Sequence, residues 1–241
     1  MPTKTIAFIG ASTGVGLSAL KHTLAAGHHA IALCRTPSKL ADLLPASSHP
    51  NLRIIQGNAK DAESVAQCLV KPDGSLVDAV VSTVGGKFIP SRLTIDDPQV
   101  CRLAMRALLD AIAQLRRQGA AGRPLVVVCS TTGISCAGRD VPLLLVPLYH
   151  VGLKVPHEDK RIMEDDLVAS GEDFAIVRCS LLVDGASETP IRVGIEDPKA
   201  GLESAAIGYT ISREDAGRWF ADNLILKDAG SYRNKLVTIT Y

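Results

Sequence analysis

Near its start the chain carries a short apolar run that ends in closely spaced glycines and then passes into a helical pattern. The run Thr5-Ile-Ala-Phe-Ile is followed by Gly10, Gly14 and Gly16. A strand, a glycine turn and a helix in this order form the arrangement in which backbone N–H groups bind a pyrophosphate. Gly10 permits the tight turn, Gly14 a close approach of phosphate, and Gly16 close helix–strand packing. The residues expected to contact a dinucleotide here are Gly10, Ser12, Thr13, Gly14, Val15 and Gly16.

Strand and helix patterns alternate along the chain. Runs rich in Val, Ile and Leu, without polar alternation, are typical of parallel strands covered on both faces. They lie at 5–9, 30–34, 52–56, 77–82, 124–129, 174–179 and 235–240. Helical patterns lie between them at 16–26, 37–44, 60–70, 97–118, 157–169 and 213–226. This order predicts a doubly wound parallel α/β sheet, the Rossmann fold, as a single domain covering 1–241.

Three of the expected helices carry start signals. Asp97 and Pro98 are expected to open the helix at 97–118, and Pro156 suits the first turn of the following helix. The segment from Ser212 to Asp215 resembles a capping box for the last helix.

One long segment, 183–211, departs from the alternation and is rich in Gly, Pro and Asp. It follows a late strand, on the side where ligands bind such sheets. We expect it to form a loop or hairpin that covers the substrate.

The composition limits the class of partner. Apolar residues make up 46% and charged residues 21% of the chain, and 26 Lys and Arg face 25 Asp and Glu. This balance gives no indication of a nucleic-acid surface or of a polybasic membrane patch. The apolar run near the start is shorter than that of a signal peptide. A small-molecule substrate is therefore expected, and the oligomeric state stays open.

The cysteines and histidines lack metal spacing. The six cysteines form no CxxC pair and mostly lie in apolar segments, which is typical of reduced thiols in the cytoplasm. The six histidines show neither HxxxH nor HxxE spacing, so no metal site is predicted.

The residue that follows the second strand distinguishes the two nicotinamide dinucleotides. An acid there would bind the ribose 2′-hydroxyl and repel a 2′-phosphate. The chain instead has Arg35, followed by Thr36, Ser38 and Lys39. An arginine fork suits a phosphate, and a charge-assisted contact contributes about 1.5–3 kcal/mol. The sequence therefore predicts NADP(H), with Arg35 and Lys39 as cofactor residues.

Polar and glycine residues also follow the third, fourth and fifth strands. The carboxyl ends of parallel strands meet at one edge of the sheet, so these residues are expected to share one pocket. The residues expected to meet the adenine, the ribose and the nicotinamide end are Asn58, Ala59, Thr83, Val84, Gly85 and Ser130.

Together these residues resemble the short-chain dehydrogenases/reductases. The motifs are Gly10-x3-Gly14-x-Gly16, Asn58-Ala59 and a serine after the fifth strand. The stretch 157–182, with a Lys…Glu helix, "SG" and a strand that ends in Arg, and the stretch 211–219 look like the atypical, NmrA-like branch. That resemblance spans nearly the whole chain and implies the fold and the cofactor. The branch includes NADPH-dependent reductases, enzymes that use the cofactor without net redox change, and non-catalytic regulators.

The catalytic set of the main branch is incomplete here. That set has a Ser, a Tyr that protonates the substrate, and a Lys four residues after the Tyr that lowers its pKa and holds the ribose. The resemblance assigns Ser130 and Lys160 to these places, but Pro156 stands where the Tyr belongs. Lys160 also has a purely structural interpretation, as an i,i+4 partner of Glu164.

Three side chains are candidates for the missing proton donor. Tyr149 and His150 precede the helix, and His157 lies one turn before Lys160. Histidine titrates near neutral pH and suits proton transfer. The sequence does not choose among them.

Two classes of function follow. One is an oxidoreductase that transfers hydride from NADPH to a carbonyl, enone or imine of a small organic substrate. This class includes a redox-neutral enzyme in which NADP(H) serves as a structural cofactor. The other is a dinucleotide-sensing regulator without turnover, which the absent tyrosine favours. The retained Lys160 and the segment 183–211 favour the enzyme.

Overall fold

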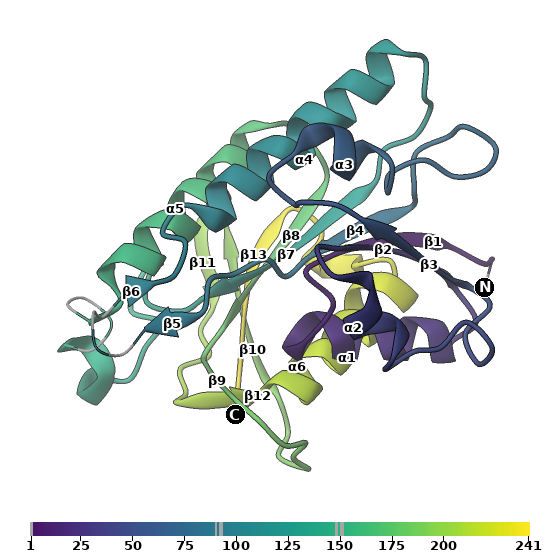
Figure 1. Cartoon of the computed structure of the whole chain (residues 1–241). Helices are drawn as coiled ribbons and strands as arrows, with labels where there is room; N and C mark the ends of the chain where they lie inside the picture. The colour runs from purple at the N-terminus through teal and green to yellow at the C-terminus, as the bar shows by residue number, and fades with distance from the viewer. Residues whose placement is uncertain (1, 90, 92–93, 148, 150–151) are drawn as a thin grey trace.

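A twisted sheet lies between two layers of helices (Figure 1). The computed structural model describes residues 2–89, 91, 94–147, 149 and 152–241. Its strands are β1 (Thr5–Ile9), β2 (His29–Cys34), β3 (Leu52–Gln56), β4 (Ala79–Ser82), β5 (Phe88–Ile89), β6 (Thr94–Ile95), β7 (Leu125–Thr131), β8 (Phe174–Cys179), β9 (Leu181–Val183), β10 (Arg192–Asp197), β11 (Gly201–Ser204), β12 (Thr210–Ser212) and β13 (Lys235–Thr240). Its α-helices are α1 (Gly14–Ala25), α2 (Pro37–Ala41), α3 (Ala62–Ala66), α4 (Val100–Arg117), α5 (Lys154–Ala169) and α6 (Arg213–Phe220). A π-helical turn, Ala221–Leu226, continues α6.

The main sheet has the order β11-β10-β13-β8-β7-β4-β1-β2-β3. From β3 to β13 all neighbours are parallel, and β10 and β11 add an antiparallel edge. The chain runs from β1 outward through β2 to β3 and then returns to β4 on the other side of β1. The strand order therefore reverses between β1 and β4, which is where such sheets open a ligand crevice.

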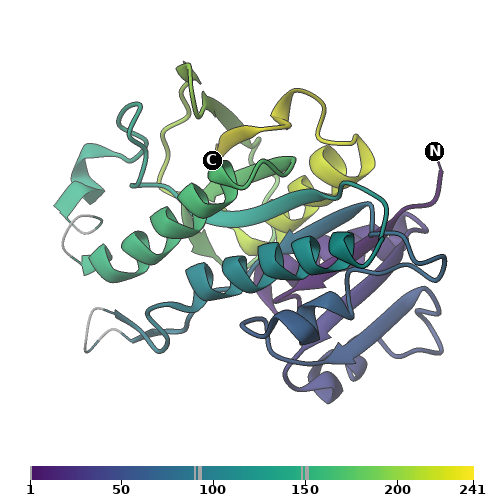
Figure 2. The same cartoon turned by 90° about the horizontal axis from the view of Figure 1, so that it is seen from above.

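Each face of the sheet has its own apolar core. On one face, side chains of α1, α2 and α6 pack with Phe8, Val127 and Val177. On the other, side chains of α3, α4 and α5 pack with Ile9, Val128 and Ile176. Figure 2 shows α4 and α5 side by side along this second face. The doubly wound, single-domain architecture expected from the alternating pattern is confirmed.

The segment 183–211 contains a hairpin, which is one of the two forms that we expected, and its role in covering the substrate stays a prediction. Its middle forms the hairpin of β10 and β11, which extends the main sheet beyond β13. Gly194 lets this hairpin close, because a Cβ at that position would lie 2.7 Å from the Ala206 backbone nitrogen. Its last part, β12, pairs with β9 in a separate small sheet. The polar composition of the segment concealed these short edge strands.

The helix α4 begins at Val100, three residues later than Asp97, and it is capped from another helix. Asp159 of α5 accepts hydrogen bonds from the backbone N–H groups of Cys101, at 2.8 Å, and Arg102, at 3.1 Å. Its carboxylate is buried and serves two of the N–H groups that a helix start leaves unpaired. A cap that comes from a distant element leaves no local sequence signal.

Two absences hold for the described part of the chain. No helix there combines the length and the apolar character that crossing a bilayer requires. No cluster of three or more His, Cys, Asp and Glu side chains is arranged there to hold a metal ion.

We expect Asp159→Ala to lower the free energy of unfolding by about 1–3 kcal/mol, because two buried N–H groups lose their acceptor. Urea unfolding followed by circular dichroism measures this change. The matched control is Asp166→Ala on the same helix, whose ion pair with Arg106 is exposed. That pair should contribute no more than about 1 kcal/mol. Equal effects of the two variants would contradict the capping role.

Candidate functional site

The turn after β1 lies so close to the end of β4 that its glycines have no room for side chains. Gly10 has a φ of +90°, and a Cβ there would lie 3.0 Å from the backbone of Thr83 and Val84. A Cβ at Gly16 would lie 2.3 Å from Thr83 Oγ1. That hydroxyl donates a 3.0 Å hydrogen bond to the Gly10 carbonyl. The contact places the positive end of α1 at the point where the strand order reverses.

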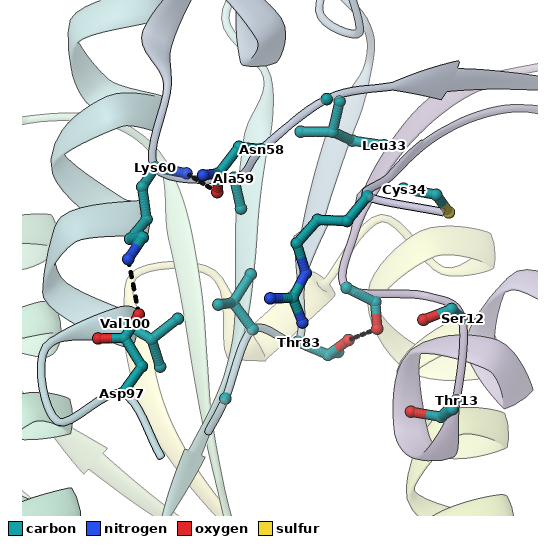
Figure 3. A pocket seen from close by; sticks show the side chains of 15 residues that line it. Ser12, Thr13, Leu33, Cys34, Asn58, Ala59, Lys60, Thr83, Asp97 and Val100 are labelled. Atoms are coloured by element: carbon teal, nitrogen blue, oxygen red, sulfur yellow. Dashed lines mark hydrogen bonds and ion pairs between the residues drawn. The ribbon is translucent and has the colours of Figure 1, made fainter. Parts of the chain in front are cut away.

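A cavity of about 280 Å³ opens beside this turn, at the carboxyl ends of β1 to β4 (Figure 3). Ser12 and Thr13 lie on one side of it, and Asn58, Lys60 and Asp97 lie opposite. Nine predicted cofactor residues line it: Gly10, Ser12, Thr13, Arg35, Asn58, Ala59, Thr83, Val84 and Gly85. Six more residues complete the lining: Leu33, Cys34, Gly57, Lys60, Asp97 and Val100.

The charged groups of the cavity favour an anionic ligand. Arg35 follows β2 directly, and its side chain lines the cavity together with Lys60 and Asp97. Lys60 Nζ lies 2.6 Å from Asp97 Oδ2. The hydrogen bond from Lys60, and more weakly the charge of Arg35, hold the pKa of Asp97 below its ordinary value. Two cations therefore face one carboxylate that is already paired.

Lys60 and Asp97 are functional candidates that the sequence analysis missed. Their ion pair joins positions 37 residues apart, and nothing near Asp97 indicates this partner. Lys60 had a weak signal, because it directly follows the predicted Asn58 and Ala59. The pair connects the end of β3 to the segment that leads into α4.

The other predicted cofactor residues lie outside the lining of this cavity. Val15 and Gly16 are buried in the first turn of α1, and Lys39 is exposed on α2. Gly14 lines a separate hollow on the opposite side of the same turn. Lys160 lies near the end of β7, towards the other half of the crevice. Direct contacts of Gly14, Val15, Gly16, Lys39 and Lys160 with the cofactor stay predictions.

Lys160 is held at the end of β7. Its Nζ donates a 2.8 Å hydrogen bond to the Cys129 carbonyl. Burial disfavours the charge, but Cys101, Cys129, Cys179 and Glu164 around it raise the pKa of Lys160. The side chain is therefore a cation at neutral pH.

Beneath the site, a buried arginine joins two carboxylates. Arg178 Nη2 lies 2.7 Å from Glu164 Oε2, and Arg178 Nη1 lies 2.7 Å from Glu196 Oε2. Glu164 thus pairs with Arg178 rather than serving as the expected partner of Lys160. Burial raises the pKa of Glu164, and the charge of Arg178 opposes this shift.

Ser130 faces this buried network. Its side chain is only 3% exposed, and it does not line the cavity described above. Its hydroxyl favours the ionised form of Glu164, although the geometry falls short of a regular hydrogen bond. A contact of Ser130 with substrate or nicotinamide stays a prediction.

Tyr149 and His157 lie together beside the loop after β7. Their ring centroids are 5.3 Å apart, and both side chains are buried. Thr132 Oγ1 and Tyr149 Oη are 3.5 Å apart, which is a long hydrogen bond. Burial raises the pKa of Tyr149 above its ordinary value, so its phenol keeps its proton at neutral pH. His150, the third candidate, lies outside the described residues.

The position of Pro156 excludes the tyrosine–lysine pair of the main branch. The helix α5 begins at Lys154, so Pro156 lies in its first turn, as expected, one turn before Lys160. Proline has no side-chain proton to donate. The structure therefore offers two candidate acids near the end of β7: Tyr149 from the segment before α5, and His157 from the first turn of α5.

Comparison with known proteins gives a family and two kinds of relative. The family model described as NAD(P)H-binding matches residues 10–225. Reductase pytE of Aspergillus terreus is 42% identical over 98% of this chain and 98% of its own length. Oxidase pynE of Aspergillus niger is 33% identical over 100% of this chain and 99% of its own length.

Solved structures share the fold at low sequence identity. A short-chain dehydrogenase/reductase from Veillonella parvula in complex with NADP has a TM-score of 0.70 and 16% identity, over 100% of this chain and 95% of that chain. ChuY, an anaerobilin reductase from Escherichia coli O157:H7, has a TM-score of 0.68 and 19% identity, over 98% and 96%.

We expect Arg178→Met to lower the free energy of unfolding by about 3–5 kcal/mol, because the buried carboxylate of Glu164 and the partly buried one of Glu196 would lose their counterion. Urea unfolding at neutral pH measures the loss. Arg106→Met is the control, since the ion pair of Arg106 with Asp166 is exposed and should contribute at most about 1 kcal/mol. A loss below about 1 kcal/mol for Arg178→Met would show that the buried network is not required for stability.

Proposed function

Because the chain belongs to the NAD(P)H-binding family and has the fold of the atypical short-chain dehydrogenases/reductases, we propose that it is an NADPH-dependent oxidoreductase of a small organic substrate. The bond reduced is a carbonyl, an enone or an imine. The observation that carries the choice of NADPH is Arg35, which lines the cavity directly after β2, where an NADH-specific site has an acid.

The cavity fits the adenosine half of this cofactor. The turn at Gly10 offers a backbone cradle that a side chain would fill. Arg35 is the residue to hold a 2′-phosphate, because its guanidinium can donate two parallel hydrogen bonds to phosphate oxygens. Lys60 adds a second cation, and we assign Asn58 and Ala59 to the adenine edge because they line the same cavity.

The nicotinamide half is expected at the end of β7. Bound NADPH would supply the hydride, and the chain would position the substrate and provide the proton. Lys160 holds a positive charge there, and Tyr149 holds a phenol proton beside Thr132. We assign proton donation to Tyr149 Oη, with His157 as its neighbour and alternative donor.

The relatives support redox chemistry without fixing its direction. One is named a reductase and another an oxidase, and both match nearly the whole chain. Turnover is therefore to be tested both ways, with NADPH and carbonyl, enone or imine substrates, and with NADP⁺ and the reduced products. We place the protein in the cytoplasm, because its six cysteines are free thiols and five of them are buried.

A second candidate function rests on Pro156. A chain without the usual tyrosine can bind the dinucleotide as a sensor or use it without net redox change. Calorimetric titration with NADPH, NADP⁺ and NADH distinguishes the two. Preference for NADPH supports the reductase, and preference for NADP⁺ supports the sensor. Binding of neither NADPH nor NADP⁺ would overturn both.

We expect Arg35→Asp to reverse the preference for NADPH over NADH. The new carboxylate would repel the 2′-phosphate and accept a hydrogen bond from the 2′-hydroxyl of NADH. Loss of the charge-assisted contact alone should weaken NADPH binding about ten- to a hundredfold. Calorimetric titration of both dinucleotides measures the ratio of affinities.

Lys39→Asp is the comparison for this variant. It makes the same charge change four residues further along, on an exposed side chain outside the cavity. We expect NADPH preference to survive it. If Arg35→Asp leaves the ratio unchanged, Arg35 does not contact the 2′-phosphate.

We expect Lys160→Ala to weaken cofactor binding or turnover about tenfold or more, because a fixed cation at the end of β7 is removed. Steady-state oxidation of NADPH and calorimetry measure the two effects separately. Lys154→Ala, an exposed lysine at the start of the same helix, is the control. A neutral result for Lys160→Ala would leave Lys160 a structural role only.

A further inference from the structure

A second arginine approaches the glycine turn from the side opposite to Arg35. Arg213 is the first residue of α6. Its Cδ lies 3.2 Å, and its Nε 3.9 Å, from the point where a Cβ of Gly14 would stand. Gly14 itself has a φ of +57°, and only glycine leaves this space to the arginine. The Arg213 side chain therefore lies directly against the turn that is expected to hold phosphate.

The packing of α6 on α1 fixes this approach. Gly217 allows it, because a Cβ there would lie 2.4 Å from Ser18 Cβ and 2.5 Å from the Val15 carbonyl. Ser18 Oγ donates a 2.6 Å hydrogen bond to the Glu214 carbonyl. The two helices run side by side on one face of the sheet (Figure 1). The backbone at Arg213 therefore cannot move independently of the glycine turn.

Arg213 lines the separate hollow beside Gly14, which shares one residue with the cofactor cavity. Thr13 lines both the cavity and this hollow, whose other walls include Gly14, Lys21 and Asp184. Arg213 therefore shares this hollow with Thr13 and Gly14 of the turn that is expected to hold phosphate.

The present partner of Arg213 is exchangeable. Arg213 Nη1 lies 2.7 Å from Asp184 Oδ1, and the Asp184 side chain is 83% exposed. Such a surface pair contributes little to stability. A diphosphate carries more charge than one carboxylate and accepts the guanidinium fork with two oxygens. Phosphate oxygens can therefore replace the Asp184 carboxylate as acceptors of the hydrogen bonds that Arg213 donates.

We propose that Arg213 binds the diphosphate of the nicotinamide dinucleotide, as the counterpart of Arg35 at the 2′-phosphate. The proposal rests on the proposed cofactor function and adds a residue from the C-terminal part of the chain. Because both dinucleotides carry the diphosphate, Arg213 contributes to affinity and not to the choice between NADPH and NADH. Asp184 acts as a competing anion that the cofactor displaces.

The test is calorimetric titration of the full chain with NADPH, NADH and 2′-AMP, which has the adenosine and the 2′-phosphate but no diphosphate. Arg213→Gln should weaken NADPH and NADH by the same factor, about tenfold or more, as expected for a lost charge-assisted contact. It should leave 2′-AMP binding unchanged. Lys21→Gln, which removes another cation from the wall of the same hollow, should change all three affinities by less than about twofold.

Asp184→Asn provides a readout that a structural ion pair would not give. Removal of the competing carboxylate should strengthen NADPH binding a few-fold, whereas loss of a purely structural pair would weaken it. Arg213→Lys keeps the charge and replaces Arg213→Gln in this test if that variant does not fold. Its affinities for NADPH and NADH should fall by equal factors, which are smaller than those expected for Arg213→Gln.

Three results would overturn the proposal. They are unchanged affinity of Arg213→Gln, a loss confined to NADPH, and a parallel loss of 2′-AMP binding. Failure of the wild-type protein to bind either dinucleotide would instead overturn the proposed function.

Discussion

The contact between the turn after β1 and the end of β4 governs the rest of the site. Gly10 and Gly16 both meet Thr83 at distances that exclude any side chain, and the Thr83 hydroxyl closes the contact on the Gly10 carbonyl. Two strands that are neighbours in the sheet but distant in sequence are thereby fixed at the point where the strand order reverses. The cavity lies at this point because β2 and β3 continue the sheet on one side of β1, whereas β4 and β7 continue it on the other.

A second close approach extends the site to the C-terminal part of the chain. Gly217 brings α6 against α1 so closely that the start of α6 lies at the glycine turn. Ser212 caps α6 by accepting hydrogen bonds from the N–H groups of Glu214 and Asp215, as its sequence predicts. The start of α6 therefore brings Arg213 to the glycine turn, together with the carboxylates of Glu214 and Asp215 in the same helical turn. Of these groups, the guanidinium is the one that can attract an anionic ligand.

The features predicted from the sequence are those encoded in adjacent residues. The glycine turn and the apolar runs gave the fold and the cofactor class, which are confirmed. The features that the sequence did not reveal depend on distant partners. Asp159 caps a helix start 58 residues earlier. Lys60 and Asp97 are brought together by the arrangement of strands between them, which includes β4. Likewise, 183–211 contains edge strands because β13 offers them an open edge, which its own composition does not show.

The end of β7 carries a fixed cation, and the tyrosine that we propose as the acid lies beside Thr132, the residue that follows this strand. Lys160 is anchored on the Cys129 carbonyl, while Pro156 removes the acid that usually precedes such a lysine. Tyr149 reaches the same strand end from the preceding loop, and its burial favours the neutral phenol. In the main branch the lysine lowers the pKa of its tyrosine, whereas here the burial of Tyr149 raises it. In the reaction that we propose, proton transfer would therefore depend on how Tyr149 is held beside Thr132, and less on electrostatic activation by Lys160.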